Sequence, residues 1–163
     1  ITVGSAGASS ITFSNIPSTY THLQIRYIAS CTASGTDINT WLRANDDTGA
    51  NYSYHYIYGT GSSAAAGGGG GTTAQIVGRI TGAGSSANIM GVAIADILDY
   101  TNTNKYKTMR CITGQDQNGS GTIFFFSGSW QNTSAITKLT IYPDNGNFTQ
   151  YSSFALYGIK AAS

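Results

Sequence analysis

The stretch QYSSFALYGI, residues 150–159, decides the fold of this chain. Side chains alternate along a strand, so Phe154 and Leu156 point to one face while Tyr151 and Tyr157 point to the other. Both faces therefore carry aromatic or aliphatic groups, which is typical of a central strand. A chain that closes with a central strand must bring earlier segments to both of its sides. Such long-range pairing predicts a β-sandwich or jelly roll.

The composition indicates one packed domain, residues 1–163. Charged residues make up only 9% of the chain, against a usual value of about 25%. Apolar residues nevertheless make up 40% and aromatic residues 12%, which is enough to build a core. The surface must then consist largely of Ser, Thr, Asn, Gln and Gly.

Alternating segments recur along the whole chain, and eight or nine of them read as strands. In residues 122–130, Phe124, Phe126 and Trp130 should line the core, with Phe125 on the opposite face. Residues 88–98 are apolar on both faces and predict a long buried strand. Residues 59–73 contain five consecutive glycines and predict a flexible surface loop, or a loop that only a neighbouring subunit orders. The fold class expected is all-β, a jelly-roll-like antiparallel β-sandwich of about eight strands.

Charge and cysteine usage argue against several partners. The net charge is +1, and the small cluster of Lys105, Lys107 and Arg110 is expected to form a solvated strand face. Phosphate contacts need several clustered cations, so no nucleic acid is expected as a partner. No apolar run approaches 18 residues, so no membrane partner is expected either. Cys31 and Cys111 lie in apolar strands, which favours free thiols over a disulfide.

Catalytic and metal-binding motifs are absent from the sequence. It contains no HExxH, GxSxG or CxxC pattern and no glutamate. Turn-forming carboxylates and surface histidines are the better interpretations of the remaining candidates. Those candidates are His22 and His55, the carboxylate pairs Asp96/Asp99 and Asp46/Asp47, and the oxygen-rich groups Asp46/Asp47/Asn51 and Asp144/Asn145/Asn147. We therefore predict no catalytic residue, no cofactor and no metal, because none has the spacing of a known site.

The tyrosines are the best candidates for a contact surface. The segment YSYHYIY places four of them on one face of a strand about 20 Å long. A tyrosine ring can stack on a sugar, and it is also enriched where subunits meet. Glycan contact and subunit packing therefore both stay open for Tyr52, Tyr54, Tyr56, Tyr58, Tyr151 and Tyr157.

Several stretches taken together resemble a known group of proteins. They are SSITFSNIPSTYTHLQIRY (9–27), LRANDDTGANYSYHYIYG (42–59), TSAITKLTIY (133–142) and GNFTQYSSFALYGIK (146–160). Their order is similar to that in small virion proteins of tailed bacteriophages, which end in an "LYG" strand. The resemblance covers nearly the whole chain except residues 59–73.

This resemblance implies a β-sandwich module on the exterior surface of a virion, often trimeric. The expected function is that of a non-enzymatic capsid decoration protein that stabilises the particle, with copies of itself and major capsid or tail proteins as partners. The alternative is the tip of a tail fibre or head fibre that binds a host-surface polysaccharide. The resemblance implies no catalytic residues.

Overall fold

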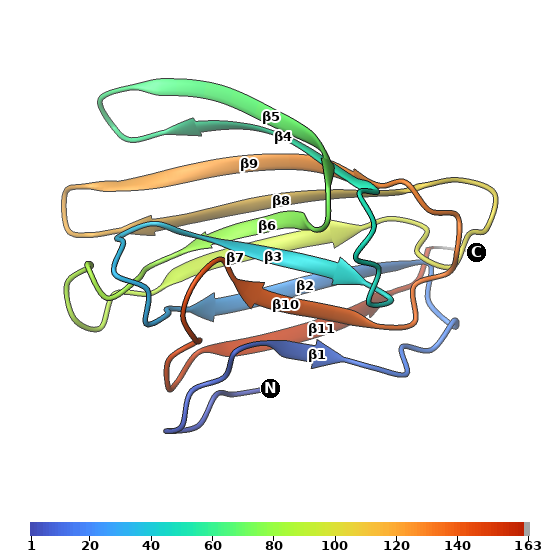
Figure 1. The fold of residues 1–163 in the computed structure, drawn as a ribbon, viewed down its shortest axis with the longest axis horizontal. Helices are drawn as coiled ribbons and strands as arrows, with labels where there is room; N and C mark the ends of the chain where they lie inside the picture. Colours follow the sequence, from blue (N-terminus) through green and yellow to red (C-terminus); the bar gives the residue numbers. More distant parts are fainter. Residues whose placement is uncertain (162–163) are drawn as a thin grey trace.

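Eleven antiparallel strands form two packed sheets in the computed structural model, which describes residues 1–161 (Figure 1). The smaller sheet has the order β1-β10-β3-β6, and the larger has the order β11-β2-β7-β8-β9-β4-β5. The described residues contain no helix long and apolar enough to cross a membrane. The strands are β1 (Ile11–Phe13), β2 (His22–Ala29), β3 (Ile38–Ala44), β4 (Tyr52–Gly59), β5 (Ala64–Thr72), β6 (Gln75–Ile80), β7 (Gly91–Ile97), β8 (Lys107–Asp116), β9 (Gly121–Trp130), β10 (Leu139–Pro143) and β11 (Ser153–Ile159).

The pairing is nested, like a long hairpin rolled into a sandwich. Strand β4 pairs with β5, β3 with β6, β2 with β7 and β1 with β10. This is the connectivity of a jelly roll. The hairpin β8–β9 is inserted between β7 and β4, and β11 is added beside β2. The predicted fold class is confirmed, with these three additional strands explaining why the count exceeds eight.

The last strand lies at the end of the larger sheet, so its predicted central position is wrong. Strand β11 pairs with β2 on one side only, and its start receives a short bridge from residues 1–3 on the other. The Ile1 amino group donates to the Phe154 carbonyl at 2.8 Å. Phe154 is buried as expected, but the remaining edge of β11 is closed by no other strand among the described residues.

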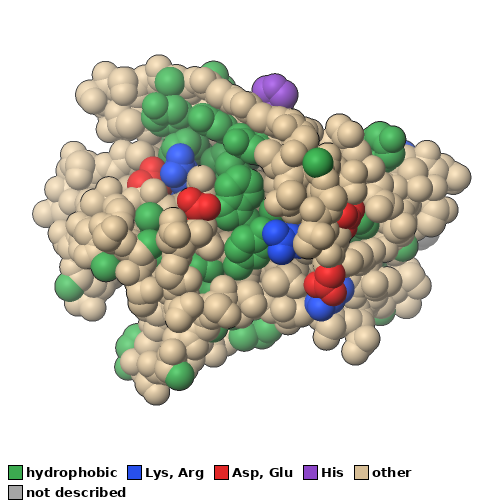
Figure 2. All heavy atoms as spheres, in the orientation of Figure 1, with side chains coloured by type: hydrophobic (Ala, Val, Ile, Leu, Met, Phe, Trp, Pro, Cys, Tyr) green, Lys and Arg blue, Asp and Glu red, His purple; other side chains and the backbone are tan. Residues whose placement is uncertain are grey.

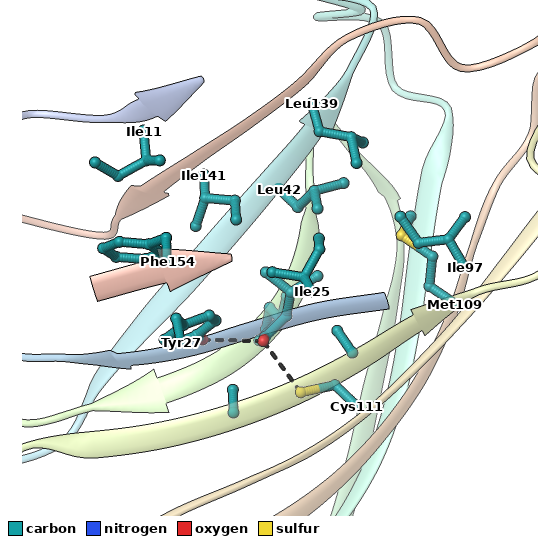
Figure 3. Packing of buried hydrophobic residues seen from close by; sticks show 14 of the residues in the cluster. Ile11, Ile25, Tyr27, Leu42, Ile97, Met109, Cys111, Leu139, Ile141 and Phe154 are labelled. Carbon is teal, nitrogen blue, oxygen red and sulfur yellow. Dashed lines mark hydrogen bonds between the residues drawn. The ribbon is translucent and has the colours of Figure 1, made fainter. Parts of the chain in front are cut away.

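The core lies between the two sheets and follows the predicted alternation. Figure 3 shows side chains of β2, β7 and β8 meeting those of β1, β3 and β10. The carbonyl of Val77 accepts from the Tyr27 hydroxyl at 3.0 Å and from the Cys111 thiol at 3.1 Å. Burial raises the pKa of both donors. Cys31 and Cys111 are both free and buried, so the predicted thiols are confirmed.

Residues 59–73 are largely a strand, and the predicted flexible loop is wrong there. Strand β5 pairs with β4 along its whole length. A Cβ at Gly67 would lie 2.6 Å from the Tyr56 hydroxyl, and one at Gly69 would lie 3.0 Å from the Tyr54 ring. The tyrosines of β4 therefore lie over the bare backbone of β5. These rings supply the packing that the glycines lack, which is why a sequence with so little side-chain content forms a strand.

Lys107 points into the core. The prediction that Lys105, Lys107 and Arg110 form a solvated face is therefore wrong for Lys107. Lys107 is fully buried, whereas Arg110 points to the opposite side and pairs with Asp96 at 3.1 Å. The ammonium of Lys107 donates to the carbonyls of Asn102 (2.6 Å), Thr133 (3.0 Å) and Lys105 (3.2 Å). These three bonds use every hydrogen of the ammonium and tie two loops to the start of β8.

Candidate functional site

The outward side of the larger sheet carries apolar residues across neighbouring strands. Residues that lie opposite each other in register form two apolar rows and one polar row. The first row runs through Ile57, Phe125, Ile112 and Ile94. The second runs through Ile123, Val92 and Ile28, with Gly59 and Gly114 among them. We call these seven apolar residues the outer apolar face.

Each residue of the outer apolar face is at least 42% exposed, up to 62% for Ile123. The predicted strand at 88–98 is confirmed as β7, but its burial on both faces is wrong, because Val92 and Ile94 face outward. The seven side chains leave on the order of 700 Å² of apolar surface in water, above the roughly 300–600 Å² of the largest patch on a typical monomer. A face of this size requires an explanation in terms of function.

Part of the outer apolar face is hollowed and bordered by opposite charges. An open hollow of about 880 Å³ lies over Val92, Ile94 and Ile112. Arg26 of β2 and Asp116 of β8 line the same hollow, and both are exposed. Neither belongs to an ion pair within residues 1–161. The polar row contains Arg110 and Asp96, and the ion pair between them neutralises the charges of that row.

The inward side of β4 presents a second surface, which we call the aromatic strip: Tyr54, Tyr56 and Tyr58. The β4–β5 hairpin extends past β6, the edge of the smaller sheet, so these rings are only partly covered (Figure 1). Centroids of consecutive rings lie 6.3 and 6.1 Å apart. Phe124 and Phe126, the cross-strand partners on β9, pack beside Tyr58 and Tyr56 with centroids 4.8–5.8 Å apart. Figure 2 shows hydrophobic side chains gathered in a hollow between the hairpin and the smaller sheet.

Polar groups border the aromatic strip at its Tyr58 end. The Arg79 guanidinium lies 4.5 Å from the centroid of Phe124, the ring on which Tyr58 stacks. Arg79 Nη1 lies 3.8 Å from Asp37 Oδ2, and both side chains are 22% exposed. Burial raises the pKa of Asp37, against the opposing influence of the Arg79 charge. We call Asp37, Asn39 and Arg79 the polar cluster, since Asn39 is the cross-strand partner of Arg79.

The other predicted tyrosines lie apart from this strip. Tyr52 shares the face of Tyr54 as expected, but it is fully buried and hydrogen-bonds to the backbone of Ala44 at 3.1 Å. Burial raises its pKa to about 12. Tyr151 precedes β11 in a turn with φ of 71° and is 70% exposed. Tyr157 lies on the outward side of β11, where the Arg26 guanidinium is 5.4 Å from its ring.

The candidate carboxylates and histidines have separate local partners. Asp96 accepts from Gln24 and Arg110, while Asp99 pairs with Lys105 and His22. Asp46 pairs with Lys138 at 2.7 Å, and His55 is an exposed residue of β4. Within residues 1–161, no three His, Cys, Asp or Glu side chains come together as a metal site. Asn45 and Asp46 have backbone in the left-handed region, as expected of turn-forming residues.

Asp47 is a structural acceptor, and its removal should make stability less dependent on pH. Its carboxylate accepts from Trp130 Nε1 (2.7 Å), Gly49 N (2.8 Å) and Asn51 Nδ2 (2.9 Å), and these bonds, led by that from Trp130, lower its pKa. A lowered folded-state pKa stabilises the fold above about pH 4 and loses that stabilisation as pH falls through it. Asp47→Asn should cost about 1–2 kcal/mol at pH 7.

Urea unfolding from pH 7 to pH 2.5 measures this effect. The difference in unfolding free energy between wild type and Asp47→Asn should shrink towards the acidic end. Asp46→Asn is the matched control, because its exposed pair with Lys138 contributes little. A constant difference across the pH range would show that the Asp47 charge is not responsible.

Arg79, Asp37 and Trp41 belong to the surroundings of the strip, although their positions in the sequence do not place them near the tyrosines. Trp41 contacts Tyr54 edge-on at 6.2 Å, while Arg79 and Asp37 are far from the tyrosines in sequence. One signal was available: Arg79 is the single charged residue in the strand QIVGRI. A charge in an otherwise apolar strand indicates a specific partner.

Comparisons with models of protein families, with curated proteins and with solved structures find no match for this chain.

Proposed function

We propose that this chain is a non-enzymatic structural module on the exterior of a tailed-phage particle. It assembles with copies of itself, as a trimer, and decorates the capsid so that contacts between neighbouring subunits are reinforced. The observation that carries this proposal is the outer apolar face. The setting rests on the resemblance of several sequence stretches, in their order, to small virion proteins of tailed phages.

A second copy of the chain is the occupant that the outer apolar face favours. The face exposes about 700 Å² of apolar surface, which is close to the roughly 800 Å² that each partner buries in a standard protein interface. Arg26 and Asp116 border one hollow, and among the described residues their side chains have only local partners, Gln24 and Tyr157 for Arg26 and Asn118 for Asp116, so the Arg26 of one copy can meet the Asp116 of another. Opposite charges at a rim fix register between partners and discourage wrong ones. The Arg26 side of one copy thus contacts the Asp116 side of the next, a head-to-tail arrangement that closes as a ring of three.

The low charge of the whole surface suits an exterior position. Contacts made by Ser, Thr and Asn depend little on salt, whereas exposed ion pairs are screened by it. The second candidate, a fibre tip that binds glycan, is supported by a different surface, the aromatic strip. The two candidates place their contacts on opposite sides of the larger sheet.

A charged substitution on the outer apolar face should dissociate the assembly. The double variant Ile112→Lys, Ile123→Lys places two ammonium groups where the side chains are 57% and 62% exposed, so the monomer fold is preserved. Light scattering should give the mass of a trimer for the wild type and of a monomer for the variant. The loss of affinity should exceed 100-fold, because two charges would be desolvated at the interface.

Tyr106→Lys is the matched control, since Tyr106 is 57% exposed and lies outside the outer apolar face. It should leave the mass unchanged. A monomeric wild type would contradict self-assembly. Cryo-microscopy of particles tests the setting: density on the head supports decoration, whereas density on tails alone, with capsids of unchanged stability after deletion, would contradict it.

A further inference from the structure

We propose that the aromatic strip and the polar cluster form a binding site for a neutral polysaccharide chain. The proposal is independent of assembly through the outer apolar face, because it concerns the opposite side of the larger sheet. The site consists of Tyr54, Tyr56 and Tyr58 as a platform, with Arg79 and Asp37 at one end.

The platform has the length and shape of a site for a chain. From Tyr54 to Tyr58 it follows four residues of a strand, about 13 Å. The rings are only partly exposed, because the β4–β5 hairpin lies on one side and the smaller sheet on the other. A broad protein surface cannot reach rings recessed in this way, whereas a narrow chain can lie along them.

The rings are held rigidly in a form that suits the apolar face of a sugar. Phe124 and Phe126 stack on each other with an angle of 8° between their planes, and both contact Tyr56 from the neighbouring strand β9. On the side of β5, Gly67 leaves room for the Tyr56 hydroxyl, which a Cβ would approach to 2.6 Å. A platform that is already ordered loses little conformational entropy on binding. Each tyrosine also offers a hydroxyl that can donate to or accept from a sugar hydroxyl.

The polar cluster contains hydrogen-bonding groups that the protein leaves without partners. Asp37 Oδ1, Asn39 Oδ1 and Arg79 Nε are buried and accept or donate no hydrogen bond within the described residues. Unsatisfied buried groups destabilise a fold and call for a reason. Because Asp37 and Arg79 are each 22% exposed, small side-chain rotations bring these groups to a bound molecule.

The charge of the site indicates what kind of ligand it takes. Asp37 and Arg79 offset each other at 3.8 Å, so the strip carries no net charge. An ionic ligand gains little there, but a chain of hydroxyl groups can donate to the carboxylate and accept from the guanidinium. Such bonds to charged groups are stronger than those between neutral ones. Apolar rings bordered by a few convergent polar groups are the usual composition of a ligand site.

The test is binding of the intact protein to a printed array of bacterial surface glycans, followed by titration calorimetry with maltoheptaose, cellohexaose and the bacterial polysaccharide that gives the strongest array signal. Three variants change the site: Tyr56→Ala removes the central ring, Gly67→Ala displaces its hydroxyl, and Asp37→Asn removes the acceptor charge. We expect Tyr56→Ala to weaken binding at least 10-fold and the other two about 5-fold. Tyr151→Ala, an exposed tyrosine outside the site, is the matched control and should bind as the wild type does.

Thermal unfolding separates loss of the site from loss of the fold. Gly67→Ala is the decisive variant in that respect, because Gly67 lies in β5 at the edge of the sheet and the added methyl group first meets the Tyr56 hydroxyl rather than the core. Weakened binding with an unchanged melting temperature supports the proposal. The proposal would be overturned by any of three results: no glycan retained, equal binding by all variants, or loss of binding in Tyr151→Ala. Light scattering of the same samples reports on assembly separately, so failure of one proposal leaves the other tested on its own.

Discussion

Replacing Lys107 with methionine should lower the free energy of unfolding by about 3 kcal/mol. The variant keeps the length and the apolar stem of the side chain but leaves the carbonyls of Asn102, Lys105 and Thr133 without their donor. Each partly buried carbonyl that loses its donor costs about 1 kcal/mol. Burial and the neighbouring Lys105 charge lower the pKa of Lys107, yet three carbonyls surround its ammonium and compensate for the water it has lost. The cost therefore comes from the acceptors rather than from lost packing.

Urea unfolding followed by tryptophan fluorescence measures this change, because Trp130 is the cross-strand neighbour of Lys107. Lys105→Met is the matched control: Lys105 is 55% exposed, and its pair with Asp99 should contribute less than about 1 kcal/mol. Equal destabilisation by the two variants would refute the assignment of Lys107 as the residue that holds the two loops together.

The variant Gly91→Ala should destabilise the fold by a similar amount, about 3 kcal/mol. Gly91 begins β7 where this strand lies against β6 of the other sheet. A Cβ there would be 2.6 Å from the Arg79 carbonyl oxygen and 2.7 Å from the Ile80 Cα. Both atoms belong to the backbone, so no side chain can rotate away and the two sheets must separate locally. Packed interiors resist such movement because every neighbouring contact is disturbed as well.

Gly70→Ala provides the comparison for this second variant. Its added Cβ would meet only the Ser53 Cβ, at 3.9 Å, which is an ordinary contact. Because alanine loses less backbone entropy than glycine on folding, Gly70→Ala should be neutral or stabilise by up to about 1 kcal/mol. Thermal and urea unfolding of both variants distinguish the two sites. A Gly91→Ala protein as stable as the wild type would show that the sheets are less tightly apposed than this geometry requires.

Alternation made the strands and their inward residues predictable, but not the position of each strand in a sheet. Phe124, Phe126, Trp130 and Phe154 are buried as the period of two indicates. Strand β11 has the same pattern as a central strand and nevertheless lies at an edge, because pairing depends on which partner strands are available. Apolar residues on both faces of a strand, as in β7, indicate that both faces are to be buried. They do not indicate whether the same chain or another one buries them.

The site residues were only partly predictable for a related reason. The tyrosines could be placed on one face from their spacing, but the role of the glycines in β5 depends on rings that come from β4. Likewise the inward position of Lys107 depends on three carbonyls from the surrounding loops. Arg79 and Asp37 reach the aromatic strip only through the pairing of β3 with β6. Such effects arise from tertiary contacts, which a local pattern does not contain.

The nested pairing has a consequence for the order in which the chain folds. The connection between β4 and β5 is only residues 60–63, whereas Thr12 of β1 lies 128 positions from its partner Thr140 in β10. The entropy lost on closing a loop grows with its length, and each inner pair that has formed shortens the loop for the next one outward. The glycine-rich hairpin should therefore form early, and β1 must wait for β10. On the ribosome, the smaller sheet cannot be completed until β10, which ends at Pro143, has been synthesised.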